Sequence, residues 1–105
     1  IDEAFAVTAR IFKKHPDIGM IFCANDMMAL GTIHYLQQQK KTGVLVAGFD
    51  ALEEARAAVR QGTLQITIDQ QADRQGYLGV RTAVEMLAGK KPAPVTMVDV
   101  LPVHL

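Results

Sequence analysis

Three polar side chains follow apolar runs of this sequence, and their chemistry suits a ligand that carries hydroxyl groups. Asn25, Asp50 and Gln70 each come directly after such a run or within two residues of its end. An amide both donates and accepts hydrogen bonds, and an ionised carboxylate accepts up to about four. Vicinal hydroxyls need both hydrogen-bond donors and hydrogen-bond acceptors as partners. A phosphate fits poorly, because the carboxylate would repel it and the sequence has no glycine-rich loop to bind it.

The same residues also have a structural explanation. Asn and Asp are favoured immediately before a helix, and Asp50 with Glu53 has the spacing of a capping box. The residues alone leave capping and ligand contact open for Asn25 and Asp50, and one residue can do both. Capping explains Gln70 less well.

No other set of residues predicts catalysis, metal binding or a cofactor. His15, His34 and His104 have no second ligand at metal spacing, so we expect them to be surface or packing residues. Cys23 lies in an apolar run without an assignable histidine, and we expect a small buried core thiol. Asp50 superficially resembles the phospho-acceptor of a response-regulator receiver domain. That fold needs an acidic pair after its first strand and a lysine after a later strand, and this order of elements lacks both. The sequence therefore predicts no enzyme.

The charges do not indicate a nucleic-acid partner for this segment. Eleven basic residues balance eleven acidic ones, so the net charge is zero. The lysine pairs at 13–14, 40–41 and 90–91 each fall at or just past the end of a predicted helix, where a cation complements the helix dipole. No aromatic residues are interleaved with them to stack on bases.

Two hydrophobic periodicities alternate along the chain and define the elements that must position the polar residues. Apolar residues recur at helical spacing in four segments: 3–14, 26–40, 51–62 and 72–88. Between them lie runs typical of strands: 18–24 and 43–49, nearly continuous and so expected to be covered on both faces, and 64–68, which alternates. A final extended run at 95–103 contains Pro102 and is expected at a sheet edge or as a crossing segment. This order predicts an α/β fold with an open, mostly parallel sheet, in which ligands bind beyond the carboxyl ends of the strands.

The length bounds the number of domains. A chain of 105 residues, half of them apolar, can form one compact core but not two independent domains. No apolar run is long enough to span a membrane, and the acids and helical periodicity of residues 1–14 do not resemble a signal peptide. Because the sequence opens within a predicted helix and without Met, we interpret it as a fragment of a longer protein.

Three segments together resemble the C-terminal half of the ribose-type periplasmic sugar-binding proteins, the type I solute-binding components of bacterial ABC transporters. They are "CANDMMALG" (23–31), "VLVAGFD" (44–50) and "GTLQITIDQQADRQG" (62–76). The resemblance implies that Asn25, Asp50 and Gln70 hydrogen-bond the hydroxyls of a pentose or hexose, with Asp26 as the helix cap. It also implies delivery of the sugar to a membrane permease, and a periplasmic location or a lipid-anchored extracellular one in a Gram-positive source.

The resemblance further divides the chain into two parts. Residues 1–70 are expected to form most of the sugar-binding lobe, and residues 71–105 a helix and strand that cross to the N-terminal lobe and return. Without that second lobe, we expect the fragment either to associate as a homodimer or to be the ordered remnant of a longer polypeptide.

The main alternative is the effector-binding core of a LacI-type transcriptional repressor, which shares the fold. Such cores commonly carry a "PPLTTV"-like stretch where this chain has "RQGTLQITIDQQ" (60–71), so the transport-type interpretation is favoured. A sensor that presents a loaded binding protein to a chemoreceptor or kinase is a third possibility left open by the sequence.

Overall fold

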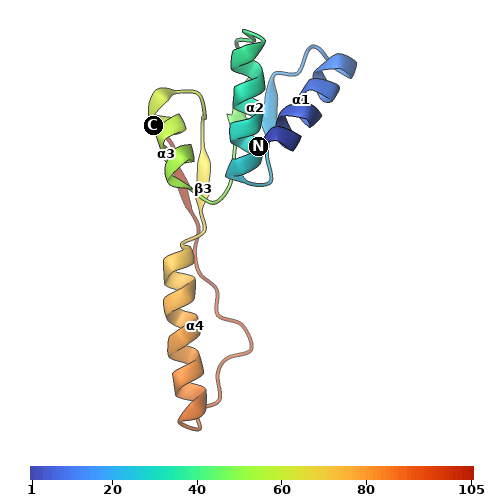
Figure 1. The fold of residues 1–105 in the computed structure, drawn as a ribbon. Coiled ribbons are helices and arrows are strands. Elements are labelled where there is room, and N and C mark those ends of the chain that lie inside the picture. The colour runs from blue at the N-terminus through green and yellow to red at the C-terminus, as the bar shows by residue number, and fades with distance from the viewer.

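Helices and strands alternate through the computed structural model, which describes residues 1–105 (Figure 1). The helices are α1 (Asp2–Lys14), α2 (Asp26–Gln38), α3 (Glu53–Gln61) and α4 (Ala72–Leu87). The strands are β1 (Met20–Phe22), β2 (Leu45–Ala47), β3 (Thr67–Asp69) and β4 (Leu101–Val103). The α/β alternation predicted from the sequence is confirmed. The strands are shorter than the predicted runs, and β3 ends one residue beyond the run at 64–68.

The strands form two hydrogen-bonded pairs, β1 with β2 and β3 with β4, which an isolated bridge joins into one layer in the order β1, β2, β3, β4. β1 and β2 are parallel, with Ile21 opposite Val46. The bridge between Ala47 and Ile66 continues the parallel pairing toward β3, supported by the backbone bond from Gly48 N to Ile66 O at 2.9 Å. β4 pairs antiparallel with β3 and forms the outer edge, where Pro102 is tolerated as expected.

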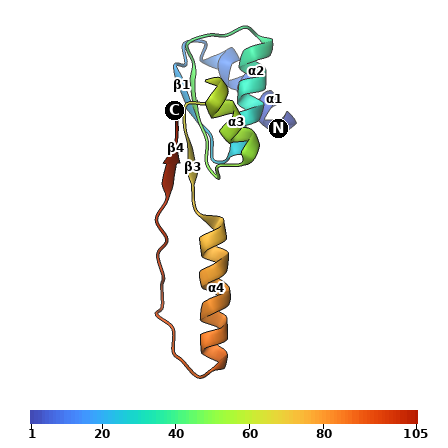
Figure 2. The ribbon, with the colours of Figure 1, turned by 90° about the vertical axis from the view of Figure 1, so that its left-hand side faces the viewer.

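The three helices α1, α2 and α3 lie on one side of the strands (Figure 2). Both crossovers, from β1 to β2 and from β2 to β3, step in the same direction across the sheet. Because parallel crossovers are right-handed, both connecting helices must cover the same face. The core lies between this face and the helices, and its most buried members include Ala29, Val46, Ala55 and Leu64.

The opposite face of β1 and β2 is open to solvent. Met20, Phe22 and Leu45 are 65, 67 and 44% exposed, whereas Val46, which points to the helices, is 1% exposed. The expectation that these two runs are covered on both faces is therefore wrong for this chain. No crossover within residues 1–105 steps in the other direction, so no helix is placed on that side.

α4 stands apart from the rest of the fold, and the molecule extends 58 × 27 × 19 Å. None of its residues is buried, so the inner face predicted from Ala72 to Leu87 is uncovered. The segment after α4 returns beside the helix to reach β4 (Figure 2). No helix in the chain combines the length and the apolar character needed to cross a membrane.

Several lysine and histidine residues for which the sequence predicts no ligand-binding role lie at a helix end or pack against aromatic rings. Lys13 and Lys14 occupy the last turn of α1, as predicted. Lys41 Nζ lies 4.9 Å from the centre of the Phe12 ring, a cation–π contact. His34 is exposed and packs its ring against Phe5, with 5.3 Å between the ring centres.

Candidate ligand-binding site

The carboxyl ends of β1, β2 and β3 meet at one edge of the sheet, and each delivers one of the predicted polar residues there. Asn25, Asp50 and Gln70 are all partly exposed, so their side chains can reach a ligand. Gln70 Nε2 donates a hydrogen bond to Asp50 Oδ1 at 2.8 Å. The structure thus brings Asp50 and Gln70 into direct contact, although they lie 20 residues apart in the sequence.

Asn25 is the N-cap of α2. Its Oδ1 accepts a hydrogen bond from Met28 N at 2.9 Å, which satisfies one of the unpaired N–H groups of the first turn. The assignment of the cap to Asp26 is therefore wrong. Capping occupies only the oxygen of the Asn25 amide, and its nitrogen still has hydrogens to donate to a ligand.

Asp50 is not a helix cap, and the proposed capping box with Glu53 does not form. The N-cap of α3 is Leu52, which makes no side-chain capping bond. Asp50 instead has φ +118° and Ala51 has φ +55°, and this turn sets the start of α3 two residues later than predicted. The Asp50 carboxylate receives only the Gln70 bond within the chain, so it keeps acceptor capacity for a ligand.

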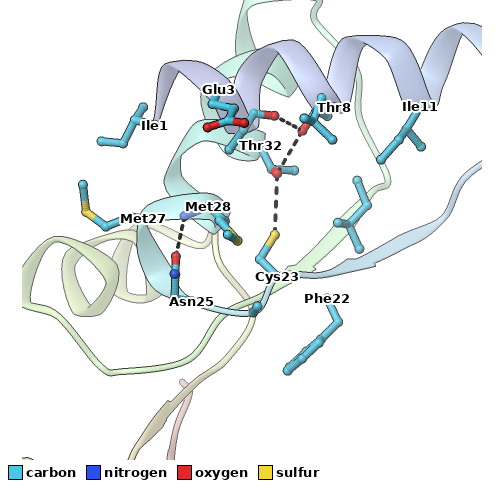
Figure 3. A pocket seen from close by; sticks show the side chains of 14 residues that line it. Ile1, Glu3, Thr8, Ile11, Phe22, Cys23, Asn25, Met27, Met28 and Thr32 are labelled. Carbon is cyan, nitrogen blue, oxygen red and sulfur yellow. Dashed lines mark hydrogen bonds between the residues drawn. The ribbon is translucent and has the colours of Figure 1, made fainter.

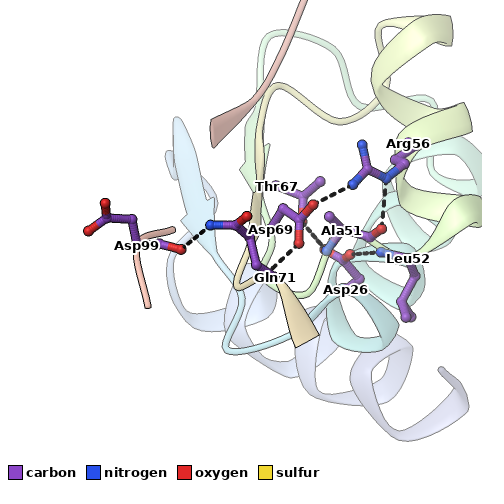
Figure 4. Close-up of polar contacts among 8 residues, drawn as sticks. All are labelled: Asp26, Ala51, Leu52, Arg56, Thr67, Asp69, Gln71 and Asp99. Atoms are coloured by element: carbon purple, nitrogen blue, oxygen red, sulfur yellow. Dashed lines mark hydrogen bonds and ion pairs between the residues drawn. The ribbon is translucent and has the colours of Figure 1, made fainter. Parts of the chain in front are cut away.

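Asp26 is fully buried and connects the start of α2 to the turn before α3 and to the start of β3 (Figure 4). Its Oδ2 accepts from Leu52 N at 2.9 Å, and its Oδ1 accepts from Thr67 Oγ1 at 2.7 Å. These partners lie 26 and 41 residues away. Sequence reasoning missed this role, because an Asp at the start of a helix looks the same whether it caps that helix or reaches across the fold.

A second set of polar contacts continues from the site toward α4 (Figure 4). Arg56 donates through Nε to Ala51 O at 3.0 Å and through its terminal nitrogen to Asp69 Oδ2 at 2.8 Å. Asp69 Oδ1 accepts from Gln71 N at 2.7 Å, and Gln71 Nε2 donates to Asp99 O at 2.7 Å. The turn after β2 is thereby connected to both segments that lead to and from α4.

A separate groove of about 490 Å³ lies between α1, β1 and the start of α2 (Figure 3). Ten of its 14 lining residues are hydrophobic, and although Asn25 borders it, neither Asp50 nor Gln70 does. Its apolar lining suits hydroxyl groups poorly. The candidate site is therefore the polar edge of the sheet.

Cys23 lines this groove and is a buried thiol, as predicted. Burial raises the pKa of the Cys23 thiol above its ordinary value, and the hydrogen bond with Thr32 Oγ1 at 3.6 Å opposes that rise. A raised pKa lowers the thiolate fraction at neutral pH, so Cys23 is not an activated nucleophile.

Comparison with known proteins identifies the family of this fold and site. Residues 1–91 match the family described as periplasmic binding protein domain. The chain belongs to the periplasmic binding protein family. Among proteins of known function, it is 41% identical over 85 residues to the ribose import binding protein of Escherichia coli K12, covering 81% of this chain. It is 32% identical over 93 residues, 88% of this chain, to a D-ribose/D-allose-binding protein of Pseudomonas aeruginosa.

Solved periplasmic binding proteins share the arrangement of elements. A periplasmic solute-binding protein of an ABC transporter from Actinobacillus succinogenes 130z, solved with bound D-allose, superposes with a TM-score of 0.92 and 34% identity. The superposition covers 96% of this chain and 36% of that protein. The chain likewise spans only 29% of each of the two relatives above. The resemblance to ribose-type periplasmic sugar-binding proteins is confirmed, whereas the LacI-type alternative gains no support from these relatives.

Proposed function

We propose that this chain supplies most of one lobe of a monosaccharide-binding protein, which holds a pentose or hexose and passes it unchanged to an ABC transporter permease. The observation that carries the proposal is the convergence of Asn25, Asp50 and Gln70 at the carboxyl edge of the sheet. In this proposal residues 1–70 belong to the sugar-binding lobe. Residues 71–105 cross to a second lobe and return.

The chemistry of the three side chains suits a sugar. The Asp50 carboxylate accepts from hydroxyl hydrogens, and such charge-assisted bonds are stronger than neutral ones. Asn25 and Gln70 add amide groups that can donate to hydroxyl oxygens. The contact between Gln70 Nε2 and Asp50 Oδ1 fixes two of the three groups relative to each other before a ligand arrives.

The site on these residues has only one wall. Sites that bind small molecules usually enclose most of the ligand, so tight binding requires a second wall facing the polar edge. The exposure of α4 and of its returning segment supports the proposal that they contact such a second lobe. The proposed location is the periplasm, or the outer cell surface with a lipid anchor.

Calorimetry tests the proposed function. The full polypeptide that contains these 105 residues is titrated with D-ribose, D-allose and D-glucose, and with L-leucine and adenine as non-sugar controls. We expect saturable heat with at least one sugar and recovery of that sugar chemically unchanged. Heat with leucine or adenine alone would contradict the proposal.

A further inference from the structure

The turn that carries Asp50 has a main-chain conformation that needs external support. Asp50 at φ +118° and Ala51 at φ +55° are consecutive non-glycine residues with positive φ. Residues other than glycine rarely adopt such φ angles, and the angles persist only where surrounding contacts hold the main chain in place. The contacts that hold this turn therefore determine where the Asp50 carboxylate points.

Asp26 and Thr67 supply the buried side-chain contacts to the turn (Figure 4), in addition to the bonds from Arg56 Nε to Ala51 O and from Asp50 N to Ile68 O. The Thr67 hydroxyl accepts from Ala51 N at 3.1 Å and donates to Asp26 Oδ1 at 2.7 Å, so one group links the turn to the buried carboxylate. The other carboxylate oxygen accepts from Leu52 N at 2.9 Å. Both side chains are 0% exposed, so neither can touch a ligand itself.

The neighbouring backbone leaves room for this arrangement only because residue 48 is glycine. A Cβ at position 48 would collide with Asp26 Oδ1 and lie 3.2 Å from Ala29 Cβ. Position 48 has no positive φ, so its lack of a side chain is explained by space rather than by backbone conformation. The carboxylate thus occupies space that a side chain at position 48 would otherwise fill.

We propose that Asp26 and Thr67 are positioning residues for sugar binding: they fix the Asp50–Leu52 turn in its strained conformation and so set the affinity through Asp50. This inference rests on the proposed function, because it assumes that Asp50 binds the sugar. It assigns a functional consequence to two buried residues that have no access to the ligand.

The test is a set of variants of the full polypeptide, titrated with D-ribose and D-allose. Thr67→Val keeps the side-chain shape but removes the hydroxyl, and we expect it to weaken sugar binding about tenfold, the effect of about one lost hydrogen bond. Thr67→Ser restores the hydroxyl and is expected to recover most of the affinity. Asp26→Asn is expected to weaken sugar binding in the same way. If this variant does not fold, the comparison of Thr67→Val with Thr67→Ser tests the positioning role by itself.

A matched substitution separates positioning from general loss of stability. Thr8 is also buried, and its hydroxyl donates to Ala4 O at 2.7 Å, away from the polar edge. Thr8→Val therefore removes a buried hydroxyl of the same kind. We expect it to lower the melting temperature while leaving sugar affinity within about twofold of the parent, as for distant independent sites.

A double-mutant cycle with Asp50→Ala completes the test. If Thr67 acts through Asp50, adding Thr67→Val to Asp50→Ala changes the affinity by less than about twofold. Equal weakening with and without Asp50, or parental affinity for Thr67→Val when Asp50→Ala is weakened, would overturn the positioning role alone. Absence of sugar binding by the parent would overturn the proposed function and this inference with it.

Discussion

Asp50 combines an unfavourable main-chain conformation with a side chain suited to a ligand. Positive φ angles at non-glycine residues cost of order 1–3 kcal/mol each, and they concentrate at functional sites. Glycine would adopt φ +118° more easily. Stability therefore does not explain why Asp occupies this position, whereas the proposed contact with a sugar would.

This explanation predicts that two substitutions of Asp50 differ in stability but weaken sugar binding alike. Asp50→Gly and Asp50→Ala both remove the carboxylate and the Gln70 bond, but only glycine relieves the backbone strain. We expect Asp50→Gly to be more stable than Asp50→Ala, with a free energy of unfolding about 1 kcal/mol higher in urea denaturation.

Both Asp50 variants should bind sugar about ten- to a hundredfold more weakly than the parent, since each loses a charge-assisted acceptor. Asp17→Ala, which removes an exposed acid in the turn after α1, is the control and should bind as the parent does. Equal stability of the glycine and alanine variants would argue against strain at position 50. Parental affinity in both would argue against its role in binding.

Sequence patterns predict the polar residues of the candidate site but not which contacts hold them in place. Asn25, Asp50 and Gln70 stand out because each follows an apolar run. The role of Asp26 depends on Leu52 and Thr67, which come close only through the tertiary fold. The strained turn at Asp50 could not be predicted either, because the capping-box spacing indicated a helix that started earlier.

At the scale of elements, helical periodicity and the order of the segments predicted the fold well. The start of α4 at Ala72 and the edge position of Pro102 are as expected. Coverage of the strands was not predictable from their apolar runs, because it depends on the direction of the crossovers. Within residues 1–105 those crossovers place helices on one face only.

The end of α3 depends on one glycine. Gly62 is its C-cap with φ +80°, and no atom lies within 4 Å of where its Cβ would be. Gly62→Ala therefore introduces backbone strain without a collision, and we expect it to lower the free energy of unfolding by about 1 kcal/mol.

Gly19→Ala is the matched control, since position 19 has equally open surroundings and no positive φ. Urea denaturation should show no loss of stability for this variant. An equal loss of stability in Gly62→Ala and Gly19→Ala would show that the positive φ of Gly62 does not account for the effect.

At the scale of the whole molecule, much apolar surface is uncovered. Val80, Val84 and Leu87 on α4 are 67, 60 and 90% exposed, and Phe22 on the open sheet face is 67% exposed. Surfaces of this kind favour association. We therefore predict that the isolated chain forms a dimer at high concentration.

Light scattering coupled to size exclusion measures this directly, with a dimer at twice the 11.5 kDa mass of one chain. Val84→Glu should shift the equilibrium toward the monomer if α4 forms the contact, whereas Lys13→Glu on α1 should not. A parent chain that stays monomeric at millimolar concentration would contradict the prediction.

We propose that the polar edge of the sheet binds sugar hydroxyls, and a crystal structure of the full polypeptide with D-ribose or D-allose is the decisive measurement. We expect sugar hydroxyls within about 2.5–3.2 Å of the Asp50 carboxylate and of the Asn25 and Gln70 amides. A sugar bound elsewhere, for example in the apolar groove beside Cys23, with these three side chains untouched, would contradict it.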